Sequence, residues 1–395
     1  YALKQYSKEG AVQSMADSFA LYLAHDARDS VPDSDSEPVS FLVIPFLPGA
    51  VGMALARLLG FGALGCLYGG RIVNLLAYTL LCALALAKAE RYRPAFAAIM
   101  LLPMSLFMGA SLSYDATLLG CYYLMLALLT RKEWNTQTAG IYTAACIFVN
   151  IAKPYLNLLW VLPIFLVAKR EWHAKGRRPL WALGGFGGAM AVTLLTEWYG
   201  TAFRYNYPII ERQGGSTVNG GEQLAFVLRN PLRTIAAFWG TLGENDFFIG
   251  QLGLFGWKDL PISFLNLTSP LVLLLAALLA AAQPKRADAF PTRRRVGGAA
   301  LLALVYAAGA MAAMYITYTP VGMVRIVGLQ ARYFLCVWLA LLPALAVLLR
   351  KTICPAITEE KAEAAITPLC ACYAVFGAVL LFQHYFVGPV YVVYA

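Results

Sequence analysis

Long apolar runs separated by short basic loops constrain this chain more than any other feature of its sequence. Of the 395 residues, 60% are hydrophobic and only 13% are charged, and several windows reach the roughly 20 apolar residues that a helix needs to cross a bilayer. The apolar residues run continuously instead of alternating with polar ones, which disfavours a transmembrane barrel. The sequence therefore predicts an all-α, polytopic integral membrane protein.

The apolar runs predict about ten membrane spans by length. The expected spans are 71–87, 95–112, 116–130, 138–152, 155–167, 180–199, 264–282, 296–319, 333–349 and 369–385. Residues 1–40 are polar, and the apolar run 41–60 is broken by Pro45 and Pro48, which is typical of a helix lying in the membrane interface. We also expect a further helix upstream of Tyr1. Four regions follow: an outer first loop with juxtamembrane helices (1–70), a transmembrane core (71–199), a long outer loop (200–262) and C-terminal transmembrane helices (263–395).

The distribution of charge predicts which ends of the spans face the cytoplasm. The net charge is +10, and basic residues cluster after alternate spans, at 88–93, 131–132, 169–178, 285–295 and 350–351. Cytoplasmic loops are enriched in Lys and Arg, which explains the basic charge better than a nucleic-acid partner does. The opposite, outer face should then hold residues 1–40, Asp115, Lys153, the 200–262 loop and the 320–332 loop.

The cysteines and histidines give little sign of a metal or disulfide framework. The eight cysteines lie mostly within apolar runs, and the three histidines are scattered. We interpret the cysteines as small core residues.

Asp115 is the acid that the topology places at an outer hairpin tip, within Ser111–Ala116. It can be a helix N-terminal carboxylate favoured by the helix dipole, with Ser113 as cap. It can equally be a general base, a metal ligand or an acid that orients substrate, because ionisable groups near membrane depth are functional candidates. The sequence does not separate the two interpretations.

Three cations share this outer face. Lys153 lies at a tight tip beside Pro154 and Tyr155, and Arg325, Gln330 and Arg332 precede the span that begins at 333. The rigid fork of donors on arginine suits phosphate, so the cations predict a phosphate or pyrophosphate site. The alternative is anchoring at the interface, for Lys153 by snorkelling and for the arginines together with Tyr333.

The 200–262 loop is long enough to indicate a function. Its paired glycines favour a mobile lid, and the segment 222–239 is expected to form an amphipathic helix. Trp239 and Trp257 could stack on a sugar ring, or could equally be interfacial tryptophans.

Six motifs in order carry a family resemblance: Arg71-Ile-Val-Asn, Leu102-Pro-Met, Ser111-Leu-Ser-Tyr-Asp-Ala, Ala152-Lys-Pro-Tyr, Leu254-Phe-Gly-Trp and Gly328-Leu-Gln-Ala-Arg-Tyr-Phe. From about residue 1 to 350 the chain resembles a bacterial family of multi-pass membrane proteins that is named only as a domain of unknown function. That family is grouped with the GT-C glycosyltransferases, which transfer sugars from polyprenyl-phosphate carriers on the outer face of the membrane.

The resemblance implies a role for each candidate residue. The segment from Tyr1 to Gly10, which ends in Lys8-Glu9-Gly10, looks like the end of a helix that follows an Asp-Glu pair. The main catalytic acids are therefore expected upstream of Tyr1. Asp115 resembles a second outer-face acid, and Lys153, Arg325 and Arg332 resemble the cations that hold the carrier phosphate.

The expected function is therefore a bacterial inner-membrane glycosyltransferase. It would move a sugar, with inversion, from a polyprenyl-phosphate donor to a cell-envelope glycan, lipid or protein acceptor on the extracytoplasmic face. A divalent cation (Mg²⁺, Mn²⁺ or Ca²⁺) held in part by Asp115 is one way to stabilise the leaving phosphate. The alternatives are a transporter or flippase for lipid-linked glycans and a non-catalytic binding protein.

Overall fold

The computed structural model describes residues 41–131, 133–152, 161–167, 184, 188, 191, 211–212, 216–243, 252–255, 260–281, 293–349 and 359–386. In this part of the chain the fold is helical, as the sequence predicts. Two short antiparallel pairs interrupt it: β1 (Glu211–Arg212) with β2 (Ser216–Thr217), and β3 (Leu254–Phe255) with β4 (Leu260–Pro261). Leu254 pairs with Pro261 and Phe255 with Leu260.

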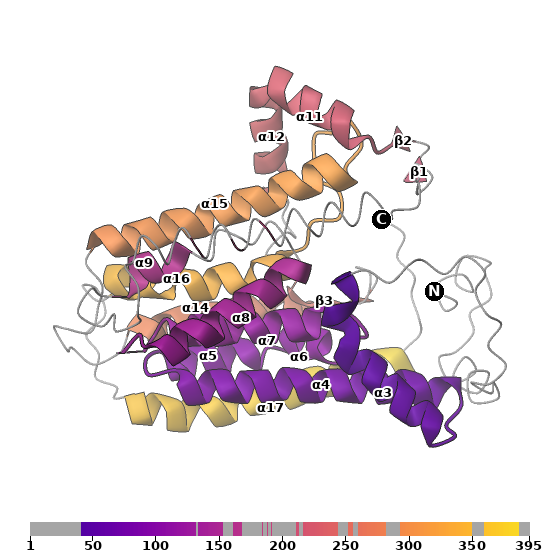
Figure 1. Ribbon diagram of the computed structural model, residues 1–395, viewed down its shortest axis with the longest axis vertical. Helices are drawn as coiled ribbons and strands as arrows, with labels where there is room; N and C mark the ends of the chain where they lie inside the picture. The colour runs from indigo at the N-terminus through magenta and orange to yellow at the C-terminus, as the bar shows by residue number, and fades with distance from the viewer. Residues whose placement is uncertain are drawn as a thin grey trace.

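The longer helices run side by side and form a bundle (Figure 1). They are α4 (Ala63–Lys88), α5 (Arg93–Met100), α6 (Pro103–Gly109), α7 (Asp115–Leu128), α8 (Thr136–Ala152), α14 (Ser263–Ala281), α15 (Arg293–Tyr318), α16 (Leu335–Leu349) and α17 (Glu359–Phe386). Shorter elements complete the fold: η1 (Phe41–Phe46), α3 (Leu47–Leu58), α9 (Leu162–Leu166), α11 (Gly220–Arg229), α12 (Pro231–Leu242) and η4 (Ala331–Phe334).

Among the described residues, three helical segments are long and apolar enough to cross a membrane: Ala63–Lys88, Val296–Ile316 and Ala364–Gln383. Ile44–Leu58, Asp115–Leu128, Ser263–Leu279 and Arg332–Leu342 are shorter apolar helices. A membrane protein with several spans is therefore supported. The expected total of ten remains a prediction, because residues 155–160 and nearly all of 180–199 lie outside the described residues.

The chain alternates between two ends of the bundle. One end, which we call the basic end, holds the C-terminus of α4 with Lys88 and the turn after α7 with Arg131. The opposite end, the Asp115 end, holds the start of α7 and the loop between α15 and α16.

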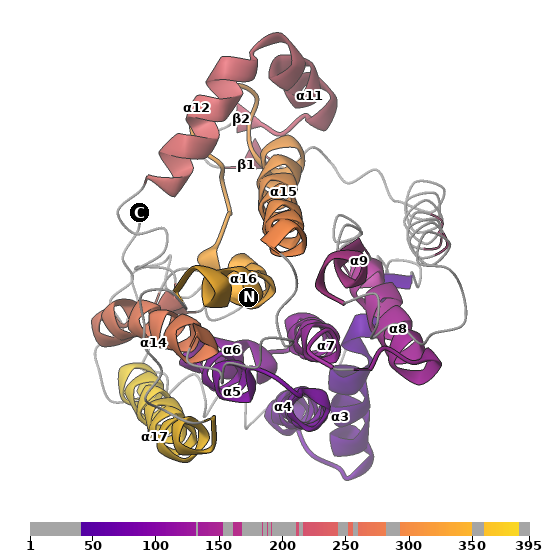
Figure 2. The ribbon, with the colours of Figure 1, turned by 90° about the vertical axis from the view of Figure 1, so that its left-hand side faces the viewer.

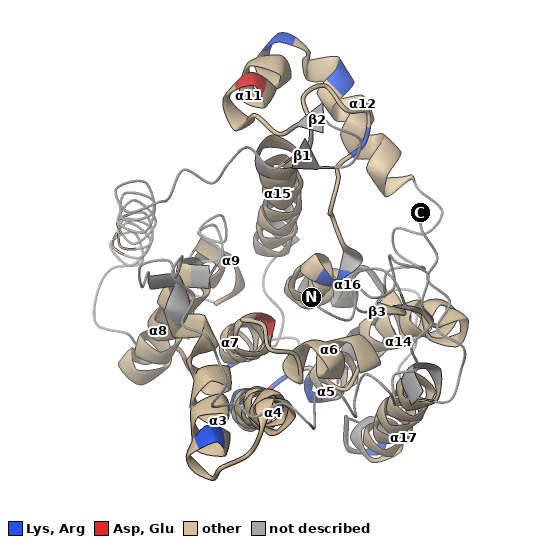
Figure 3. Cartoon of the chain, turned by 90° about the vertical axis from the view of Figure 1, so that its right-hand side faces the viewer, with Lys and Arg blue, Asp and Glu red and all other residues tan. Residues whose placement is uncertain are grey.

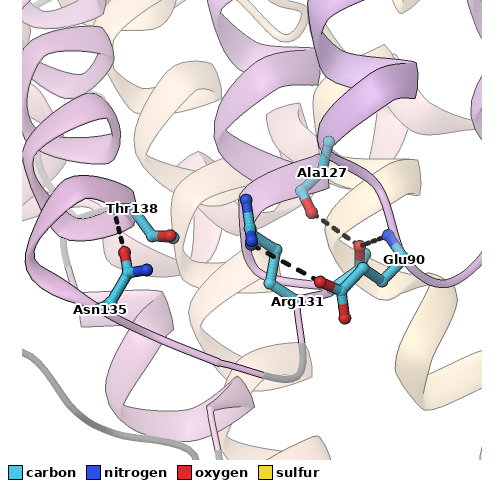
Figure 4. Close-up of polar contacts among 6 residues, drawn as sticks. Glu90, Ala127, Arg131, Asn135 and Thr138 are labelled. Atoms are coloured by element: carbon cyan, nitrogen blue, oxygen red, sulfur yellow. Dashed lines mark hydrogen bonds and ion pairs between the residues drawn. The ribbon is translucent and has the colours of Figure 1, made fainter.

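Contacts between two turns fix the basic end (Figure 4). The Thr130 hydroxyl accepts a hydrogen bond from the Glu90 backbone N–H (3.1 Å), and the Arg131 guanidinium lies 3.7 Å from the Glu90 carboxylate. Asn135 accepts from the Thr138 backbone N–H (2.8 Å) and so caps the start of α8. These bonds tie the α4–α5 turn to the α7–α8 turn.

The expected continuous span 95–112 is wrong, because two helices, α5 and α6, cover it. Pro103 has no backbone N–H and disfavours a helical conformation at Leu102, whose ψ is 136°. The Ile99 carbonyl, which loses its helical partner, accepts instead from the buried Ser105 hydroxyl (2.9 Å). The neighbouring Met100 carbonyl accepts from the Tyr78 hydroxyl (2.8 Å). The break therefore stays buried with its carbonyls hydrogen-bonded.

The expected single amphipathic helix over 222–239 is also wrong. Pro231 begins a new helix, α12, so α11 ends at Arg229 and Asn230 forms the turn. The side chain of Asn219 caps α11 by accepting from the Gly221 and Glu222 N–H groups (3.1 and 3.2 Å). The two helices form a hairpin beside α15.

Helix α7 is the centre of the bundle. Figure 2 looks along the bundle and shows α7 between α4, α6, α8 and α16, all of which contact it. Every residue from Ala116 to Leu128 is buried, as expected for a helix that is apolar on all sides.

The interpretation of the cysteines as core residues is confirmed for the six described ones that are buried; Cys372 is exposed.

Candidate functional site

Helix α4 holds the loop that leads into α7. The Arg71 Nε donates to the Ala110 carbonyl (2.9 Å). The Asn74 Nδ2 donates to the carbonyls of Ser111 (2.6 Å) and Ser113 (3.4 Å). Arg71 and Asn74 are three positions apart and therefore lie on the same face of α4. They fix the backbone immediately before Asp115.

Asp115 starts α7, and Ser113 serves as its cap in a modified form. The Ser113 hydroxyl accepts from the Asp115 backbone N–H (2.9 Å) and donates to the Asp115 Oδ2 (2.8 Å). Tyr114 occupies the formal N-cap position without a side-chain cap bond. The position of Asp115 in the first turn of α7 agrees with the helix-dipole interpretation, and its functional role stays a prediction. Its half-buried carboxylate can still accept a hydrogen bond from a ligand.

Arg332 lies in η4, directly before α16, and is oriented by neighbours from a different part of the chain. Its Nη1 lies 3.3 Å from the Met108 Sδ on α6, and its Cζ lies 5.8 Å from the centre of the Tyr333 ring. The Arg332 Nε is buried and has no hydrogen-bond partner in the described structure. A buried, unsatisfied donor on a cation requires an explanation, and an anionic ligand provides one.

The charges of Asp115 and Arg332 both reach the hydroxyl groups of Tyr114 and Tyr333. The pKa of the Tyr114 hydroxyl, just outside α7, is raised mainly by burial; the negative charge of Asp115 raises it further, and the positive charge of Arg332 lowers it. The Tyr333 hydroxyl likewise lies within the electrostatic reach of both Arg332 and Asp115. Helices α7 and α16, which these residues precede or begin, contact each other and are drawn as neighbours in Figure 3. We call these four residues, Tyr114, Asp115, Arg332 and Tyr333, the Asp115–Arg332 cluster.

Gln330 and Arg325 lie on the loop that leads to this cluster. The Gln330 carbonyl accepts from the Tyr333 N–H (3.0 Å), so Gln330 shapes the turn that starts η4. Arg325 is exposed on the same loop.

Several of the predicted site residues lie outside the described part of the chain. They include Lys153, Tyr155 and Trp257, so their participation in the site stays a prediction. Tyr1 and the rest of 1–40 also lie outside it. The acid pair expected upstream of Tyr1 is therefore not confirmed, and the structure assigns no main catalytic base there.

The loop that carries Arg325 is held by the α11–α12 hairpin. The buried Gln223 side chain accepts from the Gly322 N–H (2.8 Å), and the Thr241 hydroxyl accepts from the Ile326 N–H (2.9 Å). Both bonds join side chains of the hairpin to backbone of the loop. The hairpin therefore sets the position of the loop, and the loop leads directly into η4.

The described residues do not supply a ligand set for a divalent cation. Nowhere in the described ranges do three His, Cys, Asp or Glu side chains gather around one point. Within the Asp115–Arg332 cluster the one carboxylate, Asp115, is already bonded to Ser113. No chemical step is therefore assigned to a metal, and the expected cation ligation by Asp115 remains untested.

Sequence reasoning missed Asn74 and Tyr114 as parts of this site. Asn74 had a usable signal, because an amide inside a long apolar span is costly unless it bonds to something. For Tyr114 the one available signal was its position next to Asp115. Its link to the site depends on Arg332, which is far away in the chain.

Long apolar helices, a polar cluster at one bundle end and charged turns at the other define a helical membrane protein with several spans. The chain belongs to the family whose model is described as "Predicted membrane protein (DUF2142)", which it matches over residues 8–341. The family part of the expected resemblance is thereby confirmed, whereas its grouping with the GT-C enzymes is not tested. No curated protein and no solved structure matches the chain.

Proposed function

We propose that this protein is a membrane glycosyltransferase that moves a sugar from a polyprenyl-phosphate carrier to a cell-envelope acceptor. The observation that carries the proposal is the Asp115–Arg332 cluster. In it the charges of a carboxylate and of a half-buried arginine both reach Tyr114 and Tyr333, and the buried Nε of that arginine has no partner among the described residues. A lipid-linked sugar phosphate needs a cation for the phosphate, and its acceptor hydroxyl needs a carboxylate.

The proposed site faces the outside of the bacterial inner membrane. The support is the separation of charges along the bundle: Lys88, Arg91, Arg93 and Arg131 lie at the basic end, opposite Asp115 and Arg332. Basic loops are retained in the cytoplasm. A polyprenyl tail could remain in the bilayer while its phosphate reaches Arg332 at the far end of the bundle.

In the proposed reaction the acceptor hydroxyl oxygen attacks the anomeric carbon. The new carbon–oxygen bond forms as the bond to the phosphate oxygen breaks, and the configuration inverts. Asp115, the one carboxylate of the cluster, accepts a hydrogen bond from the acceptor hydroxyl, orients it and takes its proton as the new bond forms. Arg332 stabilises the charge that grows on the departing lipid phosphate, using the Nε donor that has no partner among the described residues. The rings of Tyr114 and Tyr333 provide flat walls for the sugar.

The test is transfer of label from radiolabelled polyprenyl-phosphate sugars in membranes that contain the protein. We expect wild type to transfer label and the Asp115→Asn and Arg332→Ala variants to lose it. Arg57→Ala is the matched control, because Arg57 is an exposed arginine in the last turn of α3 and should leave transfer unchanged. Equal unfolding profiles would show that the variants are folded.

The same experiment separates the rival functions. If the labelled lipid binds in an Arg332-dependent way but is never consumed, the glycosyltransferase proposal is wrong, and a transporter or binding protein for lipid-linked glycans takes its place. If neither binding nor transfer depends on Arg332, the cluster is structural.

A further inference from the structure

The α11–α12 hairpin exposes one continuous apolar face. Leu228, Leu232 and Trp239 are 74%, 80% and 76% exposed, and Ile235 is also exposed. Positions 232, 235 and 239 follow the spacing of one face of α12, and Leu228 adds an exposed apolar side chain near the end of α11. Exposed leucines are common one at a time, but three large apolar side chains in one row form a surface that excludes water when covered.

The opposite face of the hairpin is anchored to the protein. Gln223, Thr234, Ala237 and Thr241 are buried, and α11 packs against α15. Gln223 and Thr241 also hold the loop before η4 through the bonds given above. The hairpin therefore cannot turn its apolar face inward without breaking these contacts.

The position of the hairpin matches the membrane. Figures 1 and 2 both show α11 and α12 at the periphery, beyond α15, and Figure 1 shows α12 lying across the direction of α15 beside its C-terminal half. Helix α15 contains one of the candidate spans, and its Leu301 and Leu304 are exposed where lipid would lie. The apolar face of α12 therefore belongs to a hairpin that packs, through α11, against a membrane span.

The charges beside the face identify its occupant. Arg229 and Arg233 are exposed and flank the apolar row. Helices with apolar residues on one side and arginine beside them lie in the membrane interface, where the cations meet lipid phosphates. Trp and Arg also occur together at protein interfaces, and the packing of the hairpin against a membrane span is what favours lipid here.

We infer that the α11–α12 hairpin docks into the bilayer leaflet on the Asp115 side, with anionic phospholipid against its apolar face. The hairpin is then a fixed membrane anchor for the loop that carries Arg325, in place of the mobile lid that the glycines of 200–262 suggest. The inference does not depend on the proposed transferase activity.

The test uses the full chain in vesicles of zwitterionic and anionic phospholipid. A cysteine replaces Leu232 or Trp239 in a background without Cys354 and Cys372, and carries a fluorophore that lipids with a quencher near the headgroup can reach. Glu222→Cys, an exposed site on α11 away from the row, is the aqueous control. Leu304→Cys on α15 is the lipid control.

We expect labels at 232 and 239 to be quenched by the lipid several-fold more strongly than the label at 222, and close to the label at 304. Aqueous iodide should quench in the reverse order. If both labels follow Glu222 and are quenched by iodide, the face meets water and the inference is wrong. If neither quencher reaches either label, a protein covers the face and the inference is also wrong. Unchanged thermal unfolding of each labelled protein confirms that the fold is intact.

Discussion

Replacing Gly52 by alanine should separate α3 from α4. A Cβ atom at Gly52 would lie 2.3 Å from the Gly69 carbonyl oxygen and 2.9 Å from the Gly70 Cα. An ordinary contact needs about 3.4 Å, so the helices must move apart by roughly 1 Å, because both neighbours are backbone atoms that no rotamer change can remove. Overpacking of this kind costs about 1–3 kcal/mol.

A matched glycine provides the control for this prediction. A Cβ at Gly309, inside α15, would meet nothing within 4 Å, so Gly309→Ala should gain about 0.8–1 kcal/mol from helix propensity alone. Gly52 lies inside α3 and gains the same propensity, so the two variants should differ by the overpacking cost, roughly 1–3 kcal/mol. The assay is unfolding by SDS in mixed micelles, followed by far-ultraviolet circular dichroism.

The result that would refute the reasoning is equal stability of the two variants. Unfolding of Gly52→Ala at the same SDS fraction as Gly309→Ala would mean that α3 and α4 do not approach so closely. The contact matters beyond stability, because a Cβ at Gly70 would lie 2.6 Å from Leu112 in the loop before Asp115. A shift of α3 and α4 should therefore also disturb the Asp115–Arg332 cluster.

Three further predictions test the site and its supports. Asn74→Leu removes both hydrogen bonds that Asn74 donates to the loop before Asp115, and it should lower the free energy of unfolding by about 0.5–2 kcal/mol. Thr79→Val is the control, because the exposed Thr79 hydroxyl bonds within its own helix, and it should change the free energy of unfolding little. Burial, and then the charge of Asp115, raise the pKa of Tyr114. The neutral Tyr114 hydroxyl therefore stabilises the fold fully below the ordinary tyrosine pKa of about 10, and this stabilisation is lost as the pH rises above it. Between about pH 10 and 11.5 Tyr114→Phe should lose less stability than wild type, as measured by SDS unfolding across pH. Thr241→Val removes the acceptor for the Ile326 N–H at a cost of about 1 kcal/mol, so trypsin should cleave after Arg325 roughly fivefold faster. Thr234→Val is the control, because Thr234 is on the same helix but bonds to its own turn, and it should leave the cleavage rate unchanged. Equal cleavage rates of the two variants would show that Thr241 does not hold the loop.

Much of the fold could be predicted because its signals are local. The helices α4, α8, α14 and α15 fall within the predicted apolar runs, with ends shifted by a few residues, although α4 begins eight positions before its predicted start at 71. The two errors, at Pro103 and at Pro231, share a cause: each proline lies within an apolar pattern that continues past it. Periodicity follows the side chains, whereas the missing N–H of proline acts on the backbone.

The site was predicted less completely, because the role of each residue depends on a second residue far away in the sequence. Asp115 and Arg332 were both recognised individually, but only the three-dimensional structure shows that they act on the same tyrosines. Asn74 was missed because its role is to bond to carbonyls of Ser111 and Ser113, and no side-chain pattern marks which backbone groups need a donor.

The long separation of the cluster in the chain bears on how the protein is made. Arg332 is 224 positions from Met108, the residue its guanidinium contacts. Synthesis from the N-terminus inserts α4, α6 and α7 and completes the acidic side of the cluster while the arginine is still to be translated. A nascent or truncated chain therefore presents Asp115 without Arg332, so the cluster is incomplete. The cluster is therefore completed only when Arg332 is inserted with α16, late in the synthesis of the chain.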